Sequence, residues 1–173
     1  MRRVLRIQTS GGKVPPQAQQ QIQAAGLNPQ EGSKLVNDKV KPLADLGFQA
    51  INVEVEYDDQ SKRVTKIYVE YPPITDMLLK AAGKDAPSHQ AGKEIIGDIS
   101  LEKVAEVALI KFEELGSRTF KAALKQVVST CRSIGLTVNG KDPKVVVKEI
   151  DQGVYDELVS KYEERVKAIT QLP

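Results

Sequence analysis

The sequence predicts an α+β protein, in which a small N-terminal domain combines a three-stranded sheet with helices and the C-terminal domain is all-helical. Apolar and polar residues alternate in three short segments before residue 72, which is typical of strands. Apolar residues recur at helical spacing after residue 98. Between the two patterns stands Pro72-Pro73, a stiff connection because proline fixes φ and has no N–H to donate.

Turn and cap residues delimit the N-terminal elements. Asn28 followed by Pro29 is a typical helix start, and Gly47 places the end of that helix near residue 45. The Gln-rich residues 17–23 fit either a short helix or a mobile segment. The alternating segments around the turn Asp58–Ser61 predict a hairpin. The predicted elements are strand 3–9, helix 29–45 and strands 48–57 and 62–71.

The remaining residues are predicted to be mostly helical. Ser100 and Asp142 are good N-caps, and Gly116, Gly135 and Gly153 separate the periodic segments. The predicted elements are helices at about 75–82, from Ser100 to the break at Gly116, and at 118–134, 142–150 and 154–169, with an extended piece at 136–138 and a loop-rich segment at 83–98.

These elements predict four parts of the chain. They are an N-terminal α/β domain at 1–71, a proline hinge with a short helix at 72–83, a helical domain at 84–153 and a C-terminal helical extension at 154–173.

Composition excludes several classes of protein. The chain has 173 residues, of which 40% are apolar, enough for a buried core. It has one cysteine, so no internal disulfide indicates secretion, and no apolar run long enough to span a membrane. Trp is absent and aromatic residues make up 5%, which argues against a platform that stacks single-stranded bases. We therefore expect a cytoplasmic protein with no membrane partner.

No motif indicates catalysis or a cofactor. His89 and Cys131 are the only residues of their types, too few for a zinc site, although their spacing alone leaves a Cys–His pair open. Gly11-Gly12-Lys13 lacks the remainder of a phosphate-binding loop. We therefore expect no enzyme activity, no cofactor and no metal.

The predicted helix 118–134 has one strongly basic face. From Leu115 to Lys141 the sequence has five Lys or Arg residues and no acid. A row of cations on one rigid face attracts phosphates, and small polar neighbours allow RNA to approach closely. From charge alone, an ordinary solvated helix face is about as plausible. On a helical wheel the basic arc contains Arg118, Lys121, Lys125, Ser129 and Arg132.

Two runs in this part of the chain resemble a known family. The run from Lys121 to Lys144, with Ser-Thr-Cys-Arg-Ser-Ile-Gly at its centre, is similar to the C-terminal domain of the large-subunit ribosomal protein L-eleven family. The continuation from Lys148 to Asp156 is similar to the archaeal branch. The order of elements along the chain also agrees with that family.

The resemblance implies a structural ribosomal protein. The C-terminal domain would bind the GTPase-associated centre of the large-subunit rRNA, and the N-terminal domain, at the stalk base, would face the ribosomal stalk protein and the translation elongation factors. The implied RNA contacts are Ser129, Thr130, Arg132, Ser133 and Gly135, with Lys93 in a basic loop; Pro72 and Pro73 match the hinge, and the factor-facing residues are Gly11, Gly12, Pro15 and Pro16.

The sequence departs from the family at two places. Ser129 stands where the family usually has glycine, and the proline-rich run that follows the two glycines is replaced largely by the Gln-rich residues 17–23. Beside an ordinary but divergent member of the family, two alternatives stay open. One is a specialised paralogue with altered factor contacts, and the other is a protein-interaction module whose N-terminal sheet and final helix bind partners.

Overall fold

A computed structural model describes residues 1–90 and 93–170, and its contacts divide the chain into two compact units. One unit contains Met1–Tyr71 together with the described residues from Ile169, and the other contains Pro72–Ala168. The parts of the predicted segments 84–153 and 154–173 that cover residues 91–92 and 171–173 lie outside the described residues.

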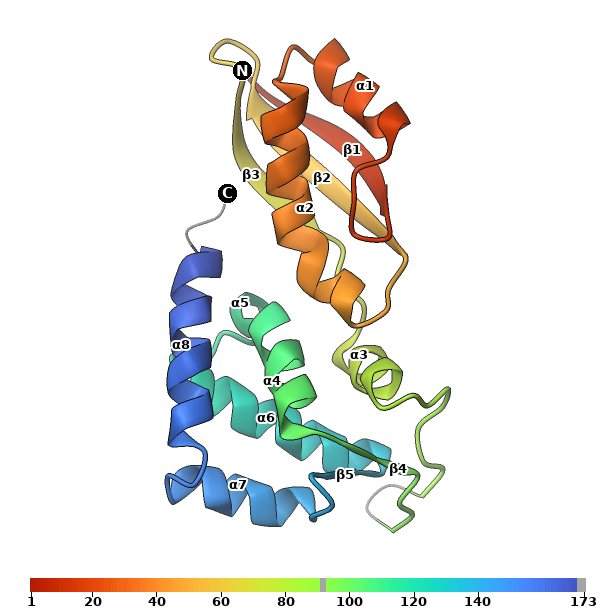
Figure 1. The fold of residues 1–173 in the computed structure, drawn as a ribbon, viewed down its shortest axis with the longest axis vertical. Coiled ribbons are helices and arrows are strands. Elements are labelled where there is room, and N and C mark those ends of the chain that lie inside the picture. The colour runs from red at the N-terminus through yellow and green to blue at the C-terminus, as the bar shows by residue number, and fades with distance from the viewer. Residues whose placement is uncertain (91–92, 171–173) are drawn as a thin grey trace. The chain divides into compact units, whose positions relative to one another are not determined.

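The first unit is built on a three-stranded antiparallel sheet in the order β1-β2-β3 (Figure 1). Ile7 of β1 lies opposite Val53 of β2, which in turn lies opposite Val69 of β3. Alternate residues of β2 and of the second half of β1 point to the buried face, as the sequence pattern predicts. The strands are β1 Arg2–Ser10, β2 Ala50–Asp58 and β3 Arg63–Val69, so the predicted sheet is confirmed.

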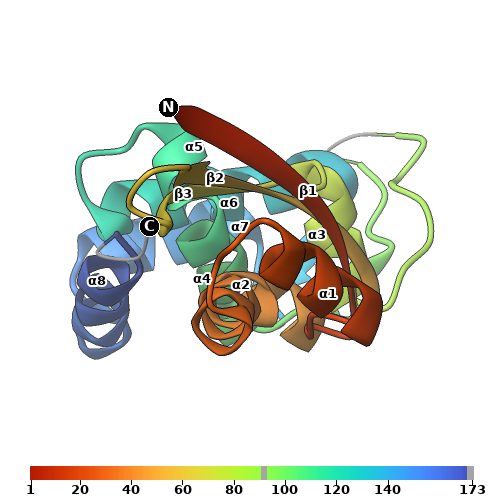
Figure 2. The same ribbon diagram turned by 90° about the horizontal axis from the view of Figure 1, so that it is seen from above.

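Two helices, α1 (Pro16–Ala24) and α2 (Pro29–Asp45), cover one face of this sheet (Figures 1 and 2). The Gln-rich segment forms α1, because its two apolar residues, Ala18 and Ile22, are one turn apart and both are buried. Asn28 caps α2 as predicted, and its side-chain oxygen accepts from the N–H groups of Gln30 and Glu31.

The second unit is mostly helical, as predicted, and is organised around α6. Helix α4 packs against α6, α3 contacts both, and α7 lies along α6. The side of α6 that faces these helices is fully apolar, which explains its central position. The helices are α3 Ile74–Ala81, α4 Leu101–Ile110, α5 Phe112–Leu115, α6 Phe120–Ile134, α7 Pro143–Asp151 and α8 Asp156–Thr170.

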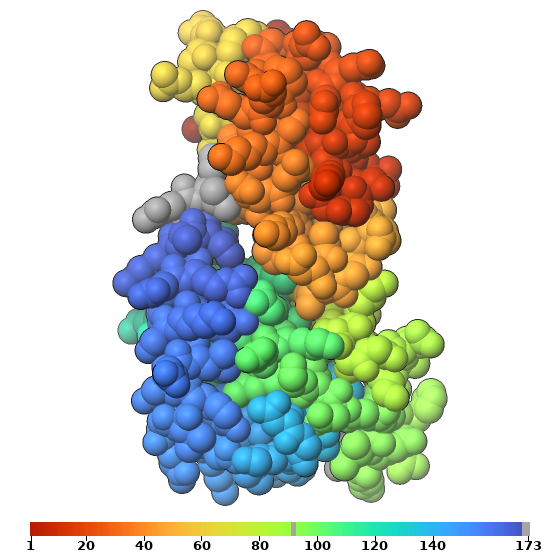
Figure 3. Space-filling view, in the orientation of Figure 1, coloured from red at the N-terminus to blue at the C-terminus, as the bar shows by residue number. Residues whose placement is uncertain are grey.

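Helix α8, the predicted C-terminal helical extension, packs against the core of the second unit through residues 156–168. The Tyr162 ring stacks on Phe120 of α6, with 5.2 Å between centroids. The Tyr162 hydroxyl donates to Glu106 of α4 at 2.8 Å, and the Arg165 guanidinium also donates to that carboxylate. Figure 3 shows α8 and α7, in dark and light blue, together on one surface of this unit. Truncation of α8 would therefore expose the core around Phe120.

A short parallel pair, β4 (Gly97–Ile99) and β5 (Leu136–Val138), completes the second unit. The sequence predicts β5 as an extended piece, but places residues 97 and 98 in a loop. That expectation is wrong, because the partner strand lies almost 40 residues away in sequence and no local alternation marks it. Across this pair, Asp98 accepts from the Thr137 hydroxyl and the Gly140 N–H.

Asn139 follows β5 and joins it to the start of α4. It has φ +51° in the left-handed region, and its side-chain oxygen accepts from the Leu101 N–H at 3.0 Å. Replacing Asn139 with alanine is expected to lower the free energy of unfolding by about 1–2 kcal/mol, since both the hydrogen bond to the Leu101 N–H and a residue tolerant of this conformation are lost. Urea unfolding followed by circular dichroism measures this change.

Asn139→Gly is the matched control for that substitution. Glycine adopts the left-handed conformation without strain but has no side-chain acceptor. We expect it to recover part of the loss, and equal stability of the alanine and glycine variants would show that the backbone conformation contributes nothing.

Candidate nucleic-acid interface

The helix predicted to carry the basic face is α6. Thr119 caps it, with its hydroxyl oxygen accepting from the Ala122 N–H at 3.2 Å, and Gly135 ends it in a left-handed conformation. The helix therefore begins at Phe120 and not at residue 118. Arg118 lies before the cap, exposed but not on the helix face where the wheel places it.

The most exposed side of α6 is uncharged. It is formed by Ala122, Gln126, Ser129 and Ser133, four small or flexible side chains. Lys121, Lys125 and Arg132 lie along one edge of this stripe, with side chains that are 36%, 35% and 40% exposed. The predicted cations thus flank this uncharged stripe, and the small or flexible side chains of the stripe allow a ligand to approach the helix closely.

Acidic residues reach this flank from elsewhere in the sequence. The Lys121 Nζ lies 3.8 Å from Asp156 Oδ1, the Lys125 Nζ 2.6 Å from Asp151 Oδ1, and the Arg132 Nε 3.7 Å from Asp142 Oδ1. The sequence shows no acid between Leu115 and Lys141. The packing of α7 along α6 brings Asp142 and Asp151 to this flank, and the start of α8 brings Asp156.

A groove of about 510 Å³ runs between α6 and α7. Its lining combines three cations, two hydroxyls and an apolar floor, and contains no acid. Convergent cations beside small side chains match the chemistry of a sugar–phosphate backbone. The lining residues are Ser129, Arg132, Ser133, Pro143, Lys144, Val147 and Lys148.

Lys144 and Lys148 are the residues of this groove that the sequence reasoning missed. Both are exposed and lie one turn apart on α7. Their i,i+4 spacing on a predicted helix is a signal that the sequence itself contains. Lys141 is less available, because Glu149 accepts from its ammonium group at 2.9 Å, which raises the pKa of Lys141.

The hydroxyls of α6 already use their hydrogens. Ser129 Oγ donates to the Lys125 carbonyl at 2.9 Å, Thr130 Oγ1 to the Gln126 carbonyl at 3.1 Å, and Ser133 Oγ to the Thr130 carbonyl at 2.7 Å. Ser129 and Ser133 are exposed and Thr130 is half-buried. A hydroxyl that donates to a backbone carbonyl still has lone pairs, so these groups can accept from a ligand without rearranging.

Gly135 is buried at the C-terminal end of α6, where the backbone of residues 134 and 135 holds the segments around Ser88 and Ile96. The Ile134 carbonyl accepts from the Ser88 N–H at 3.0 Å, and the Gly135 carbonyl accepts from the Ile96 N–H at 2.8 Å. Lys93 is exposed within the loop held by these two bonds, so the fold brings its loop to the end of α6.

The predicted factor-facing residues lie together at the end of β1. Gly11 and Gly12 both have positive φ, at +59° and +79°, and the Gly11 N–H donates to the Gln49 carbonyl at 2.8 Å. Pro15 and Pro16 begin α1. The exposed residues of α1 are mainly glutamines, so this end of the first unit is polar but uncharged along the helix.

The predicted hinge residues lie at the boundary between the two units. Pro72 is the first residue of the second unit, and Pro73 is the N-cap of α3. Because α3 packs against α4 and α6, the segment that follows the two prolines belongs to the second unit.

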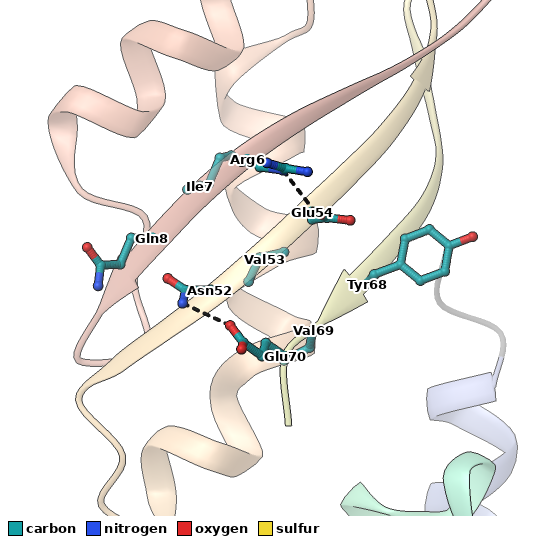
Figure 4. Close-up of a pocket in the computed structure, with 9 residues that line it drawn as sticks. All are labelled: Arg6, Ile7, Gln8, Asn52, Val53, Glu54, Tyr68, Val69 and Glu70. Atoms are coloured by element: carbon teal, nitrogen blue, oxygen red, sulfur yellow. Dashed lines mark hydrogen bonds and ion pairs between the residues drawn. The ribbon is translucent and has the colours of Figure 1, made fainter. Parts of the chain in front are cut away.

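The open face of the sheet has a hollow of about 600 Å³ (Figure 4). Its polar groups pair with each other: Arg6 donates to Glu54 at 3.0 Å, and Asn52 donates to Glu70 at 2.9 Å. Lys66 lies over the Tyr68 ring, 5.1 Å from its centroid. These charges are already satisfied within the sheet, so the groove between α6 and α7 is the stronger candidate for a ligand.

The residues considered for catalysis have no suitable surroundings. Cys131 is buried on the apolar side of α6, and burial raises the pKa of its thiol to about 12, so it is not a nucleophile near neutral pH. His89 lies in an exposed loop. In the described part of the chain, no group of three or more His, Cys, Asp or Glu side chains is placed to hold a metal ion. Within residues 1–90 and 93–170, no helix has the length and apolarity needed to cross a membrane.

Comparisons with known proteins agree on one family. Residues 70–138, which include α4 and α6, match the family model described as ribosomal protein L11, RNA binding domain. The chain is 38% identical over 165 residues to the large ribosomal subunit protein uL11 of Sulfolobus acidocaldarius, covering 94% of this chain and 95% of that protein. It is 37% identical over 166 residues to the uL11 protein of Desulfurococcus amylolyticus, covering 95% of each.

Solved structures of the large ribosomal subunit of Haloarcula marismortui also contain a similar chain. The similarity covers 39% of this chain and 97% of that chain, with 31% identity and a TM-score of 0.38. The relatives named uL11 are ribosomal proteins and not enzymes.

Proposed function

The chain belongs to the ribosomal protein L11 (uL11) family, and from that premise we propose that its second unit binds the GTPase-associated centre of large-subunit rRNA through the groove between α6 and α7. As a family member it is a structural constituent of the large ribosomal subunit, with an RNA-binding domain and no enzymatic role. The binding face, the rRNA target and the protein partners are parts of the proposal.

The observation that carries the proposal is the composition of the groove. Arg132 of α6 and Lys144 and Lys148 of α7 converge on a space that no acid lines. Beside it, the low uncharged stripe of α6 allows an RNA backbone to reach the helix surface. Folded RNA is recognised mainly by shape and by phosphate and ribose contacts, which is the chemistry that this surface offers.

The sequence-predicted residues take different parts in this proposal. Ser129 and Ser133 contact ribose or phosphate in the groove, and Lys121, Lys125 and Thr130 extend the contact along α6. Arg118 and Lys93 reach phosphates beyond the two ends of the helix. Gly135 is buried, and it acts by holding the loop that carries Lys93.

The first unit is proposed to form the stalk base in the cytoplasmic ribosome. Gly11, Gly12, Pro15 and Pro16 face the stalk protein and the translation elongation factors, and Pro72-Pro73 acts as the hinge. The family membership supports this part of the proposal. The uncharged exposed side of α1 favours contacts with these partners that depend little on salt.

Footprinting of the full chain on large-subunit rRNA tests the proposed target. We expect protection of one contiguous folded region, the GTPase-associated centre, at concentrations that leave an unrelated folded RNA unprotected. Protection scattered over many regions would contradict a dedicated site. Recovery of protein partners that is unchanged by nuclease treatment, together with absent protection, would instead favour the protein-interaction module.

A further inference from the structure

Three acids form a ladder of ion pairs along the basic flank of α6. Lys121, Lys125 and Arg132 fall within about 40° of one another on the helix, at ~100° per residue. Asp156, Asp151 and Asp142 meet them in reverse order, because the chain returns antiparallel along α6. Together Asp142, Asp151 and Asp156 make up the acid ladder.

The three ion pairs of the acid ladder contribute little to stability. The carboxylates are 55%, 52% and 66% exposed, and two of the three pairs are longer than 3.5 Å. Exposed ion pairs of this kind contribute little to folding, because solvent screens the charges and both side chains lose freedom. The fully apolar side of α6 already holds it in the core of the unit.

The acid ladder does change the electrostatic attraction between α6 and a polyanion. At a distance of more than about 8 Å, a phosphate experiences a flank whose three cations are balanced by three carboxylates. A phosphate can pair with one of these cations only where it comes close enough to replace the carboxylate that the cation already contacts. An RNA whose phosphates lie elsewhere faces the carboxylates instead, and the repulsion between like charges weakens its binding.

We propose that Asp142, Asp151 and Asp156 determine RNA selectivity by competing with ill-fitting phosphates for Lys121, Lys125 and Arg132. The inference rests on the proposed RNA-binding function and adds a cause for its selectivity. The open groove, where Lys144 and Lys148 have no acid in the lining, supplies affinity; the acid ladder penalises RNA that fits the groove alone.

The test compares the wild-type chain with the triple variant D142N/D151N/D156N. Asparagine keeps the shape of each side chain, and at position 142 it keeps the cap of α7, where Oδ1 accepts from the Lys144 N–H at 2.9 Å. The control D85N/E113Q/E164Q has the same change in net charge and alters three exposed acids of the same unit that pair with none of the three cations.

Dissociation constants are measured for the GTPase-associated RNA and for an unrelated RNA duplex over a series of salt concentrations. We expect D142N/D151N/D156N to bind the duplex roughly tenfold more tightly, with a salt slope steeper by about 2. The affinity for the GTPase-associated RNA should rise by a smaller factor, so the ratio between the two RNAs falls. The control variant should raise both affinities by the same small factor.

An unchanged ratio in D142N/D151N/D156N, or a change equal to that of the control, would overturn the proposal. Thermal unfolding of each variant establishes that the fold is kept. A failure of the proposed function is distinguishable, because the wild-type chain itself would then bind the two RNAs equally. Selective wild-type binding that survives loss of the acid ladder would reject only the present inference.

Discussion

Replacing Arg132, Lys144 and Lys148 together with alanine is expected to weaken binding to the GTPase-associated RNA about a hundredfold. The three side chains supply the cations of the groove between α6 and α7. Each charge-assisted contact with a phosphate contributes about 1 kcal/mol, and loss of three contacts should lower the salt slope by about 2–3. Alanine at position 132 also leaves Asp142 without its partner beside the groove, which adds repulsion.

Filter binding or anisotropy at several salt concentrations measures both quantities. The matched control replaces Lys34, Lys41 and Lys161, three exposed lysines that do not line the groove. The control should change affinity only through net charge. If both variants lose the same affinity and the same salt slope, the groove is not the RNA-binding surface.

Gly135→Ala is expected to cost about 3 kcal/mol or more of the free energy of unfolding. Gly135 has φ +92°, and a Cβ placed there lies 2.7 Å from the Glu94 carbonyl oxygen and 2.8 Å from the Ser88 Cβ. Left-handed backbone costs a residue with a side chain about 1–2 kcal/mol, and overpacking adds about 1–3 kcal/mol. The obstructing oxygen belongs to the backbone, so the chain at Glu94 must move.

Denaturant unfolding measures the loss, and hydrogen exchange at the Ser88 and Ile96 amides reports whether the loop separates from α6. Gly116→Ala is the matched control, because φ is +65° there but no atom lies within 4 Å of the added Cβ. Gly116→Ala should lose only the part of the free energy of unfolding that comes from the left-handed backbone. Equal losses in the two variants would show that the contacts around the added Cβ at position 135 do not destabilise the protein.

Much of this fold is predictable because its signals are local. Asn28 before Pro29 identifies the start of α2, and the alternation on both sides of the turn identifies the β2–β3 hairpin. Each signal depends on residues only a few positions apart. Local signals do not decide whether residues 17–23 form a short helix or a mobile segment. Ala18 and Ile22 stabilise a helix there only because the rest of the first unit buries them.

The features that sequence reasoning missed depend on distant contacts. Strand β4 exists because β5 lies beside it, and the acids that meet the α6 cations come from the two ends of α7 and from the start of α8. A helical wheel places Lys125 correctly on a polar side of α6, yet it contains no information about Asp151. For the same reason the sequence alone does not identify Lys144 and Lys148 as groove residues, because the groove exists only where α7 packs along α6.

The hydroxyls of Ser129 and Ser133 have one further consequence. Their hydrogens are committed to backbone carbonyls, so toward the groove they present acceptors only. Deoxyribose has no hydroxyl at its 2′ position to donate to them, whereas ribose has one. If the groove holds a sugar–phosphate backbone as proposed, its cations attract the phosphates of both polymers alike, and we expect this pair of serines to favour RNA over DNA of the same shape.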